Sequence, residues 1–390
     1  MTCCDALLES GKTRRVLFIS TVPETIWYFL FPFSDALRKR GFFVAAAARD
    51  MESCERSKPH FDCLHNIRWN RNPSQLGNLI HGIADVRRLV REGEYDVVHV
   101  HSPIASFVTR FALRKWRAAG LVRVYYTAHG FHFFEGNHPL KNFCFRALEK
   151  RAAAWTDKLI VINKEDEQAA KSFGTITHER IVFTPGIGVD ISQYGKGATS
   201  DARARVRQEL GIPMDAKTVL VLAELTPRKR PQDFLNALVF LADLNVHAIL
   251  AGTGVWHQKM QALARKLGVG ARAHFVGFRN DVPDLFKAAD VFCLLSRQEG
   301  LPRCIMECMA AGVPVVGTRI RGTSDLLAHD CGILVDVGDV RGAAEALRRT
   351  LTDAALAHRL ISNAKQHVQK YDFQNVWGYY NQLYAAAQVS

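Results

Sequence analysis

The chain has 390 residues, of which 48% are hydrophobic and 23% are charged, and its formal net charge is +13. These proportions are typical of a soluble globular protein with two domains. No apolar run is long enough to span a bilayer, since "TIWYFLFPF" (25–33) is too short. Residues 1–15 lack a positive segment followed by an apolar one, so we expect no secretory signal.

The cysteines and the net charge narrow the class of protein further. The cysteine count is odd and no two form a Cys-x-x-Cys pair, which favours a reduced, cytoplasmic protein. The positive charge favours an anionic partner, which could be nucleic acid, anionic lipid or a phosphorylated small molecule. Zinc-finger spacing and RNA-recognition aromatic motifs are both absent from the sequence, so we expect no nucleic-acid partner.

Short apolar runs alternate with amphipathic stretches in the first half of the chain. This alternation predicts right-handed βαβ units, and therefore a parallel sheet with helices on both faces. The predicted strands are 14–20, 42–48, 96–101, 122–129, 158–163 and 180–186.

A polar stretch (191–217) interrupts this pattern, and the alternation then begins again. The sequence thus predicts two doubly wound, Rossmann-like domains whose sheets face each other across a cleft, because ligands bind outside the carboxyl ends of such strands. We place the first domain at 1–195, the second at 196–370, and a last helical segment at 371–390 that crosses back to the first domain. The predicted strands of the second domain are 218–225, 247–254, 273–278, 290–296, 313–318 and 332–337.

The segment "QEGLPRCIME" (298–307) follows a buried strand and opens a predicted helix that ends at Gly312. Pro302 suits the first turn of a helix, and Gly300 lets the main chain pass close to a ligand. The N–H groups of Leu301, Arg303 and Cys304 then form a positive helix end that favours a phosphate group.

Two carboxylates flank that helix end. Glu299 precedes it, and Glu307 lies about one and a half turns inside the helix. A molecule with a diphosphate in its middle and hydroxyls at both ends, such as a nucleotide sugar, would satisfy all of these groups. Two other interpretations remain open: Glu299 could simply complement the helix dipole, and Glu307 could lie on a solvated helical face.

At these residues the chain resembles a known family. "EGLPRCIME" with the following "CMAAGVPVVGTRIRGTSDLL" resembles the Glu-x7-Glu signature of family 4 retaining glycosyltransferases, which have the GT-B fold. The segments "DVVHVHSPIASFVTRFALRK", "VYYTAHGFHFF" and "LEKRAAAWTDKLIVINKED" resemble the bacterial branch that builds surface polysaccharides, and "TPGIGVDIS" resembles the segment that closes the first domain. The resemblance covers nearly the whole chain.

The resemblance implies roles for the donor-binding residues. Glu299 would contact the transferred sugar and Glu307 the ribose, while the main chain around Gly300, Leu301 and Pro302 would bound the sugar and the diphosphate. Arg303 adds charge or is solvated. "AELTPRKRPQDF" (223–234) resembles the loop in which an Arg and a Lys clamp the diphosphate. Lys229 matches the Lys, Glu224 occupies the position of the Arg, and Arg228 could supply the missing charge.

His129 ends a predicted strand of the first domain, and the resemblance implies an acceptor-side role near the reacting carbon. We therefore expect Glu299, His129 and Lys229 to be the catalytic residues. Other histidines (His99, His101, His132 and His138) lie nearby in the sequence, but their spacing matches no standard zinc pattern, so no metal is expected. The family's mechanism implies no cofactor, because cations and a helix end stabilise the departing diphosphate.

The sequence gives less direct evidence about the acceptor substrate than about the donor. The stretch 106–123 places Arg110, Arg114, Lys115, Arg117 and Arg123 around Trp116, which predicts a basic helix on an anionic membrane. The apolar "IWYFLF" (26–31) could meet a lipid tail or belong to the core. We therefore expect a polyprenyl-diphosphate-linked saccharide as acceptor, a UDP-sugar as donor, and peripheral attachment to the inner face of the membrane.

Two rival functions share these features. A UDP-sugar 2-epimerase has the same two-domain architecture but needs no acceptor. A non-catalytic, basic protein that binds membrane or nucleic acid could keep the same fold, and Glu224 in the Arg position is the observation in its favour.

Overall fold

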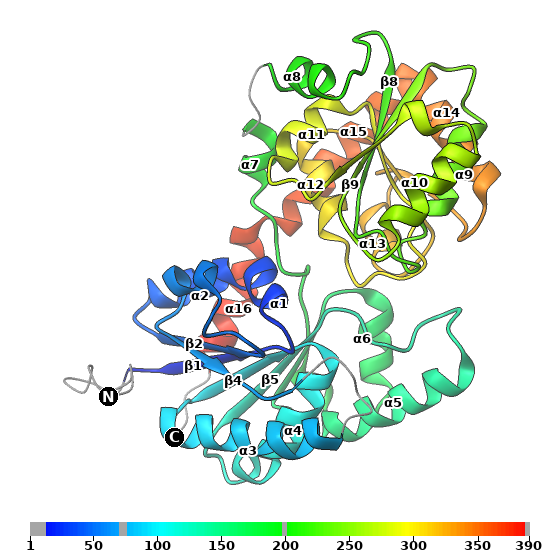
Figure 1. Cartoon of the computed structure of the whole chain (residues 1–390). Helices are drawn as coiled ribbons and strands as arrows, with labels where there is room; N and C mark the ends of the chain where they lie inside the picture. Colours follow the sequence, from blue (N-terminus) through cyan, green and yellow to red (C-terminus); the bar gives the residue numbers. More distant parts are fainter. Residues whose placement is uncertain (1–12, 70–75, 197–200, 387–390) are drawn as a thin grey trace. The chain divides into compact units, whose positions relative to one another are not determined.

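The structure is a computed structural model that describes residues 13–69, 76–196 and 201–386. It contains two compact units (Figure 1). The N-terminal unit comprises Met1–Ile187 with Val376–Ser390, and the C-terminal unit comprises Gly188–Asn375. The sequence had placed these changes of domain at 195/196 and 370/371. Most of the segment in which we expect no secretory signal, residues 1–12, lies outside the described residues.

The N-terminal unit contains a seven-stranded parallel sheet in the order β3-β2-β1-β4-β5-β6-β7. Its strands are β1 (Arg15–Ile19), β2 (Phe43–Ala48), β3 (Cys63–Asn66), β4 (Val97–His101), β5 (Arg123–Ala128), β6 (Lys158–Val161) and β7 (Ile181–Phe183). All except β3 lie inside the predicted runs. The edge strand β3 has the sequence CLHN and is only partly buried, so it lacks the continuous apolar run typical of a central parallel strand.

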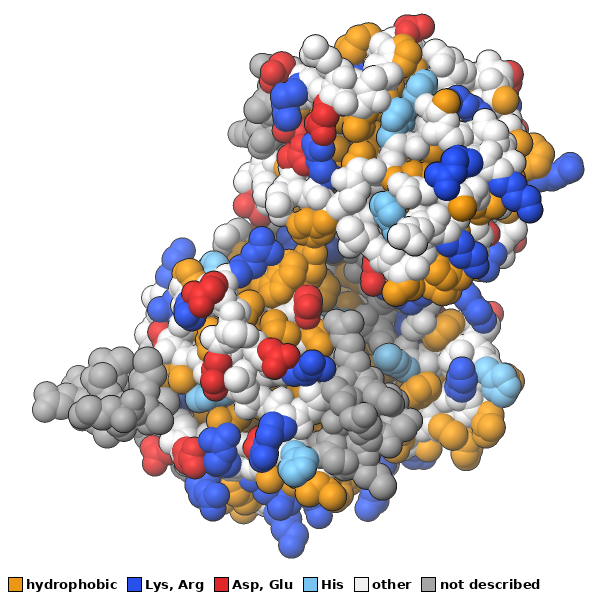
Figure 2. Space-filling model, viewed as in Figure 1, with side chains coloured by type: hydrophobic (Ala, Val, Ile, Leu, Met, Phe, Trp, Pro, Cys, Tyr) orange, Lys and Arg blue, Asp and Glu red, His pale blue; other side chains and the backbone are white. Residues whose placement is uncertain are grey.

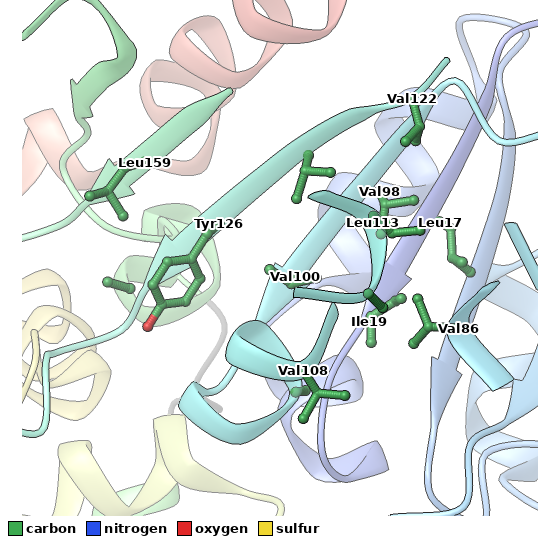
Figure 3. Close-up of a cluster of buried hydrophobic side chains, with 14 of the residues drawn as sticks. Leu17, Ile19, Val86, Val98, Val100, Val108, Leu113, Val122, Tyr126 and Leu159 are labelled. Carbon is green, nitrogen blue, oxygen red and sulfur yellow. The ribbon is translucent and has the colours of Figure 1, made fainter. Parts of the chain in front are cut away.

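Helices cover both faces of this sheet: α1, α2 and α16 lie on one face, and α3 and α4 on the other (Figure 1). Valine, leucine and isoleucine side chains of β1 and β4 pack against Val86 of α3 and Val108 and Leu113 of α4 in a fully buried cluster (Figure 3). The helices are α1 (Pro23–Phe29), α2 (Phe31–Arg38), α3 (Leu76–Gly93), α4 (Pro103–Ala118), α5 (Pro139–Ala153), α6 (Lys164–Lys171) and α16 (Phe373–Ala385).

The C-terminal unit repeats the arrangement with a six-stranded parallel sheet in the order β10-β9-β8-β11-β12-β13. Its strands are β8 (Lys217–Leu222), β9 (Val246–Ala251), β10 (Ala273–Gly277), β11 (Val291–Leu294), β12 (Val315–Thr318) and β13 (Ile333–Val335). Its helices are α7 (Ile191–Lys196), α8 (Ala202–Glu209), α9 (Pro231–Val239), α10 (His257–Lys266), α11 (Val282–Ala288), α12 (Arg303–Ala311), α13 (Thr323–Leu326), α14 (Val340–Thr352) and α15 (Ala354–His367).

Both sheets are doubly wound, and in each the strand order reverses beside the first strand. The reversal falls between β1 and β4 in the N-terminal unit and between β8 and β11 in the C-terminal unit. Ligands of open α/β sheets bind at the carboxyl ends of the strands at such a point. The loops that follow these strands are therefore the places to look for a site in each unit.

The last helix, α16, is built into the N-terminal unit from Val376 onward. Tyr380 and Tyr384 are buried there, and the Tyr125 hydroxyl donates a hydrogen bond of 3.1 Å to the Leu383 carbonyl. The end of the chain thus completes the covering of one sheet face.

No helix in the described ranges is both long and apolar enough to span a membrane. Lys and Arg side chains are spread over the visible face of both units (Figure 2). The net positive charge therefore does not mark a single binding stripe on this face.

Candidate active site

A cluster of charged side chains lies at the carboxyl ends of β8 and β11, which pair with each other. Lys229 follows β8 and Glu299 follows β11. The Nζ atom of Lys229 lies 2.6 Å from Oε1 of Glu299, and a guanidinium nitrogen of Arg228 lies 3.4 Å from Oε2. The reversal of strand order therefore brings together residues that are 70 positions apart in the chain.

Glu299 is an ionised carboxylate inside the protein, with 7% of its surface exposed. Burial alone raises the pKa of a carboxyl group, but Lys229 and then Arg228 outweigh this effect and hold the pKa of Glu299 below its usual value. A charged, fixed carboxylate at a loop end can accept hydrogen bonds from hydroxyl groups. Glu299 also lies before the N-terminus of α12, so the alternative that it complements the helix dipole stays open beside its pairing with Lys229.

The loop that carries Glu299 is braced by a neighbouring segment after β12. The Arg321 guanidinium donates a hydrogen bond of 3.1 Å to the Glu299 carbonyl. Gly322 has φ +72°, and a Cβ atom at this position would lie 2.0 Å from the Gly300 carbonyl oxygen. Only glycine permits this close approach. The sequence by itself predicts no role for Arg321 or Gly322. The glycine in "RIRGTSD" is the only feature there that could have indicated a close main-chain approach.

Helix α12 begins immediately after this loop. Pro302 has an extended backbone and is the residue before the first helical residue, Arg303, while Gly312 ends the helix with φ 74°. The helix therefore ends where predicted, and Pro302 stands one position outside its first turn. The amides of Arg303 and Cys304 belong to that first turn, where N–H groups and the helix dipole favour an anion.

Glu307 lies in α12 and has 8% of its surface exposed, so it does not belong to a solvated face. Its Oε1 accepts a hydrogen bond of 2.7 Å from the Tyr194 hydroxyl and lies 2.9 Å from Nε of Arg303. Burial and, to a smaller extent, the negative charge of Glu307 raise the pKa of Tyr194. The hydroxyl therefore stays protonated and can donate this hydrogen bond. Arg303 is thus a partner of Glu307 rather than a solvated side chain.

Tyr194 was not predicted as a site residue. It lies on α7, inside the polar stretch that the sequence presents as a break between domains. A single tyrosine among polar residues gives no periodic signal, and its role depends on the fold that brings α7 to α12.

The basic loop after β8 differs from its expected form in one respect. Glu224, which occupies the position of the family's Arg, is exposed, whereas Arg228 reaches Glu299. The segment "GTG" (252–254), which follows β9, packs against this loop. A Cβ atom at Gly252 would lie 2.0 Å from the Ala223 carbonyl oxygen, and one at Gly254 would lie 2.5 Å from that of Leu225.

The N-terminal unit has a histidine cluster at its own point of reversal. His99 and His101 lie on β4, and His129 follows β5. Nδ1 of His101 lies 2.9 Å from Nε2 of His129, and the ring of Phe29 stacks on His129 with a centroid distance of 5.2 Å. His99 contacts the hydroxyls of Tyr384 (2.6 Å) and Thr127 (2.8 Å).

These histidines are neutral at physiological pH. Burial lowers the pKa of His129 to about 4 and that of His99 to about 3, and it lowers the pKa of His101 well below the usual value. In each case the imidazole loses the water that would stabilise its charged form. The candidate site of this unit is therefore an uncharged hydrogen-bonding group.

The hydrogen bonds of His101 also determine which nitrogen of His129 carries the proton. Nε2 of His101 is buried and has no hydrogen-bond partner among the described residues. A buried N–H without an acceptor is tolerated less well than a buried lone pair, so we assign the proton of His101 to Nδ1. His101 then donates to Nε2 of His129, and the proton of His129 lies on Nδ1, where it can be donated to a substrate oxygen.

His132 and His138 do not join this cluster, since both are exposed. Within the described part of the chain, no three His, Cys, Asp or Glu side chains are grouped so as to hold a metal ion.

The basic helix predicted over 106–123 is largely α4, and it does not present the predicted surface. Arg110 is fully buried, where it forms an ion pair of 2.8 Å with Glu149. Arg117 pairs with Asp157 at 2.9 Å, and Trp116 packs against the core. Of the five predicted cations, only Lys115 is exposed, while Arg114, Arg117 and Arg123 are partly buried. Ile26 and Leu30 of the apolar "IWYFLF" stretch are also core residues.

Two doubly wound parallel units, with charged residues at the strand ends of the second, have the architecture of the GT-B fold. Comparison with known protein families supports this assignment of the fold. The sequence model of the family "Glycosyltransferase Family 4" matches residues 29–193, and that of the family "Glycosyl transferases group 1" matches residues 202–367.

Individual relatives cover most of the chain. It is 31% identical over 352 residues to EpsD of Bacillus subtilis (strain 168), which carries the name of a glycosyltransferase, covering 89% of this chain and 90% of that protein. It is 26% identical over 316 residues to the UDP-Gal:alpha-D-GlcNAc-diphosphoundecaprenol alpha-1,3-galactosyltransferase of Escherichia coli, covering 78% and 80% of the two chains. The chain therefore belongs to the family 4 glycosyltransferases, as its motifs predicted.

Solved structures show the same fold. The structure of Anabaena Alr3699/HepE in complex with UDP-glucose has a TM-score of 0.79 at 22% identity and covers 95% of this chain and 99% of that one. WaaG, a glycosyltransferase involved in lipopolysaccharide biosynthesis, has a TM-score of 0.76 at 20% identity and covers 95% and 100%.

Proposed function

We propose that this glycosyltransferase moves a sugar from a UDP-sugar to a lipid-linked saccharide, with retention at the anomeric carbon, during surface polysaccharide synthesis. The observation that carries the proposal is the pairing of Glu299 with Lys229 and Arg228 beside the N-terminus of α12. The Escherichia coli relative is named for a UDP-sugar donor and a diphosphoundecaprenol acceptor, and Anabaena HepE was crystallised with UDP-glucose. Both names support this choice of donor, and the former supports this class of acceptor.

The residues take distinct roles in this proposal. Glu299 accepts hydrogen bonds from the transferred sugar, and Glu307, oriented by Tyr194 and Arg303, holds the ribose hydroxyls. Lys229, Arg228 and the amides that open α12 bind the diphosphate. Gly300, Leu301 and Pro302 shape the loop around it, and the neutral His129 donates a hydrogen bond on the acceptor side.

The proposed chemistry breaks the bond between the anomeric carbon and the diphosphate oxygen and forms one from that carbon to the acceptor oxygen. The acceptor hydroxyl transfers its proton to the departing phosphate, which lies on the same face of the sugar. Negative charge grows on the diphosphate in the transition state, where Lys229, Arg228 and the helix dipole stabilise it. This stabilisation requires no metal ion, and neither carboxylate acts as a nucleophile.

The decisive experiment incubates the full-length protein with radiolabelled UDP-sugars and a bacterial lipid extract. Label that moves into the lipid fraction supports the proposal, and NMR of the product linkage tests retention. Epimerised UDP-sugar without transfer would instead identify a 2-epimerase. Absence of turnover with every donor would favour a non-catalytic binding protein. Full activity in excess EDTA is expected, and loss of activity that Mg²⁺ restores would overturn the metal-independent step.

A further inference from the structure

Helix α5 of the N-terminal unit has an apolar face that the protein does not cover. Its residues Leu140, Phe143, Cys144, Ala147 and Leu148 follow the spacing i, i+3, i+4, i+7 and i+8. This spacing normally marks the side of a helix that packs into the core. Here all five residues are exposed, with 64% of Leu140, 72% of Phe143 and 48% of Leu148 accessible to solvent.

The other faces of this helix hold it to the unit. Glu149 pairs with the buried Arg110, and Ala152 and Ala153 are core residues. In the earlier turns the Arg146 guanidinium donates a hydrogen bond of 2.7 Å to the Ser172 hydroxyl, beside a pocket of about 450 Å³ that Phe143 and Arg146 of α5 and residues of α6 line. The helix is therefore fixed in place while its apolar face is presented to the outside.

The exposed charges of α5 are all positive. Lys141, Lys150 and Arg151 are exposed, and none of them lines the pocket. Glu149, the sole acidic residue of the helix, is buried. In the view of Figure 2, hydrophobic side chains lie beside Lys and Arg side chains over α5, at the lower right.

We propose that α5 docks this protein onto an anionic membrane surface, with its apolar face at the boundary between headgroups and acyl chains. The exposed apolar side chains of α5 can enter the boundary between headgroups and acyl chains, while the exposed cations beside them meet the lipid phosphates. A second copy of this chain would instead bring cations against cations, whereas anionic lipid phosphates complement them. The inference rests on the proposed function in one respect, since a lipid-linked acceptor offers its saccharide at this surface.

Partition into vesicles tests the proposal directly. The full-length protein is expected to sediment with phosphatidylglycerol vesicles, and much less with phosphatidylcholine vesicles, at moderate salt. The double variant Leu140→Ser/Phe143→Ser should lower the partition coefficient at least about tenfold, because two partly inserted apolar side chains are lost. The matched control is Ile80→Ser/Leu121→Ser, whose side chains are 69% and 67% exposed in the same unit.

A second pair of variants tests the charges. Lys141→Glu/Lys150→Glu should weaken vesicle binding by more than about 25-fold, since each cation near an anionic surface contributes about fivefold. The control Lys39→Glu/Lys115→Glu changes the net charge by the same amount at exposed sites outside α5. It also tests the α4 surface through Lys115.

The results separate this inference from the proposed function. Equal losses in the variants and their controls, equal binding to both kinds of vesicle, or no binding at all would overturn it. A dimer in analytical ultracentrifugation that only the α5 variants dissociate would assign the face to a second copy instead. Transfer to a short-chain, water-soluble acceptor should be unchanged in the α5 variants. Vesicle binding that depends on α5, without transfer to any acceptor, would leave this inference intact and overturn the proposed function.

Discussion

The two units share a strand order, and each carries a candidate site where that order reverses, but the two sites differ in charge. In the C-terminal unit, Glu299 and Glu307 are buried carboxylates that are each paired with cations. In the N-terminal unit, burial holds His99, His101 and His129 in their neutral form. The same topology thus supports a site suited to a charged diphosphate and a site suited to neutral hydroxyl groups.

The difference follows from what surrounds each group. Each carboxylate has a lysine or an arginine within 3 Å, and for Glu299 these cations hold the pKa below its usual value in spite of burial. The histidines contact one another and hydroxyl groups, and a charge on any of them would go uncompensated. Both Glu299 and the histidines are shielded from water, and the charge of their neighbours decides which of them stays ionised.

The largest effect is expected for Lys229→Ala in the C-terminal unit. Removal of the cation leaves Glu299 buried without its closest partner and takes a positive charge from the proposed diphosphate site. We expect kcat/KM for transfer to fall by about 100- to 1,000-fold. The control is Lys266→Ala, an exposed lysine on α10. Unchanged kcat/KM in a folded Lys229→Ala protein would remove Lys229 from the site.

Glu307→Gln tests the second carboxylate. The amide keeps the size of the side chain and can still accept from Tyr194, but it loses the charge that strengthens a hydrogen bond to a hydroxyl. We expect the affinity for UDP, measured by calorimetry, to fall about 10- to 100-fold. Glu345→Gln on the exposed face of α14 is the matched change of charge. Equal affinities of the two variants would contradict the ribose role.

Gly322→Ala tests the brace of the donor loop. The new Cβ atom would collide with the Gly300 carbonyl, whereas Gly268 has the same φ of +72° and no atom within 4 Å of such a Cβ. Gly268→Ala should cost only about 1–2 kcal/mol of unfolding free energy, for the left-handed backbone. Gly322→Ala should lose more than this and also bind UDP more weakly. If both variants bind UDP like the parent, the brace has no role in donor binding.

The last prediction concerns pH and the N-terminal unit, and near neutral pH its effect is the smallest. The pKa of His129 is about 4 and that of His99 about 3 in the folded protein, against 6.5 for the ordinary side chain. The unfolded chain therefore binds more protons than the folded one between these values, and stability falls as the pH falls below about 6.5. The slope is at most about 1.4 kcal/mol per pH unit for each histidine.

Unfolding in urea at several pH values measures this slope. His101→Gln should reduce it, and the matched control is His178→Gln, at an exposed site outside the cluster. A slope that is the same in all three proteins would show that the cluster does not titrate in this range.

Several features were predictable because they depend on local sequence. The central strands appear as continuous apolar runs, since helices cover both of their faces. Gly312 ends α12 because it adopts a left-handed backbone, which its sequence context indicated. The short edge strand β3 and the role of Tyr194 carry no comparable pattern, so the sequence did not reveal them.

The proposed membrane-docking helix shows most clearly what the sequence could not predict. Arg110 and Trp116 of α4 and Leu140 and Phe143 of α5 are all cationic or apolar residues on helices. The fold buries Arg110 against Glu149 and packs Trp116 on the core, but leaves Leu140 and Phe143 exposed. Periodicity shows that a helix has an apolar face, and only packing shows whether that face is covered.

The amino-acid sequence alone determined that this protein has two doubly wound α/β units and that its second unit carries a glycosyltransferase signature. Strand periodicity, glycine positions and acid spacing are local properties, and they are written directly in the chain. Only the tertiary structure decided that Lys229 reaches Glu299, that Tyr194 holds Glu307, that the histidines are neutral and that α5 is exposed. Each of these depends on which distant residues the fold brings within a few ångströms, and on how much water it leaves around them.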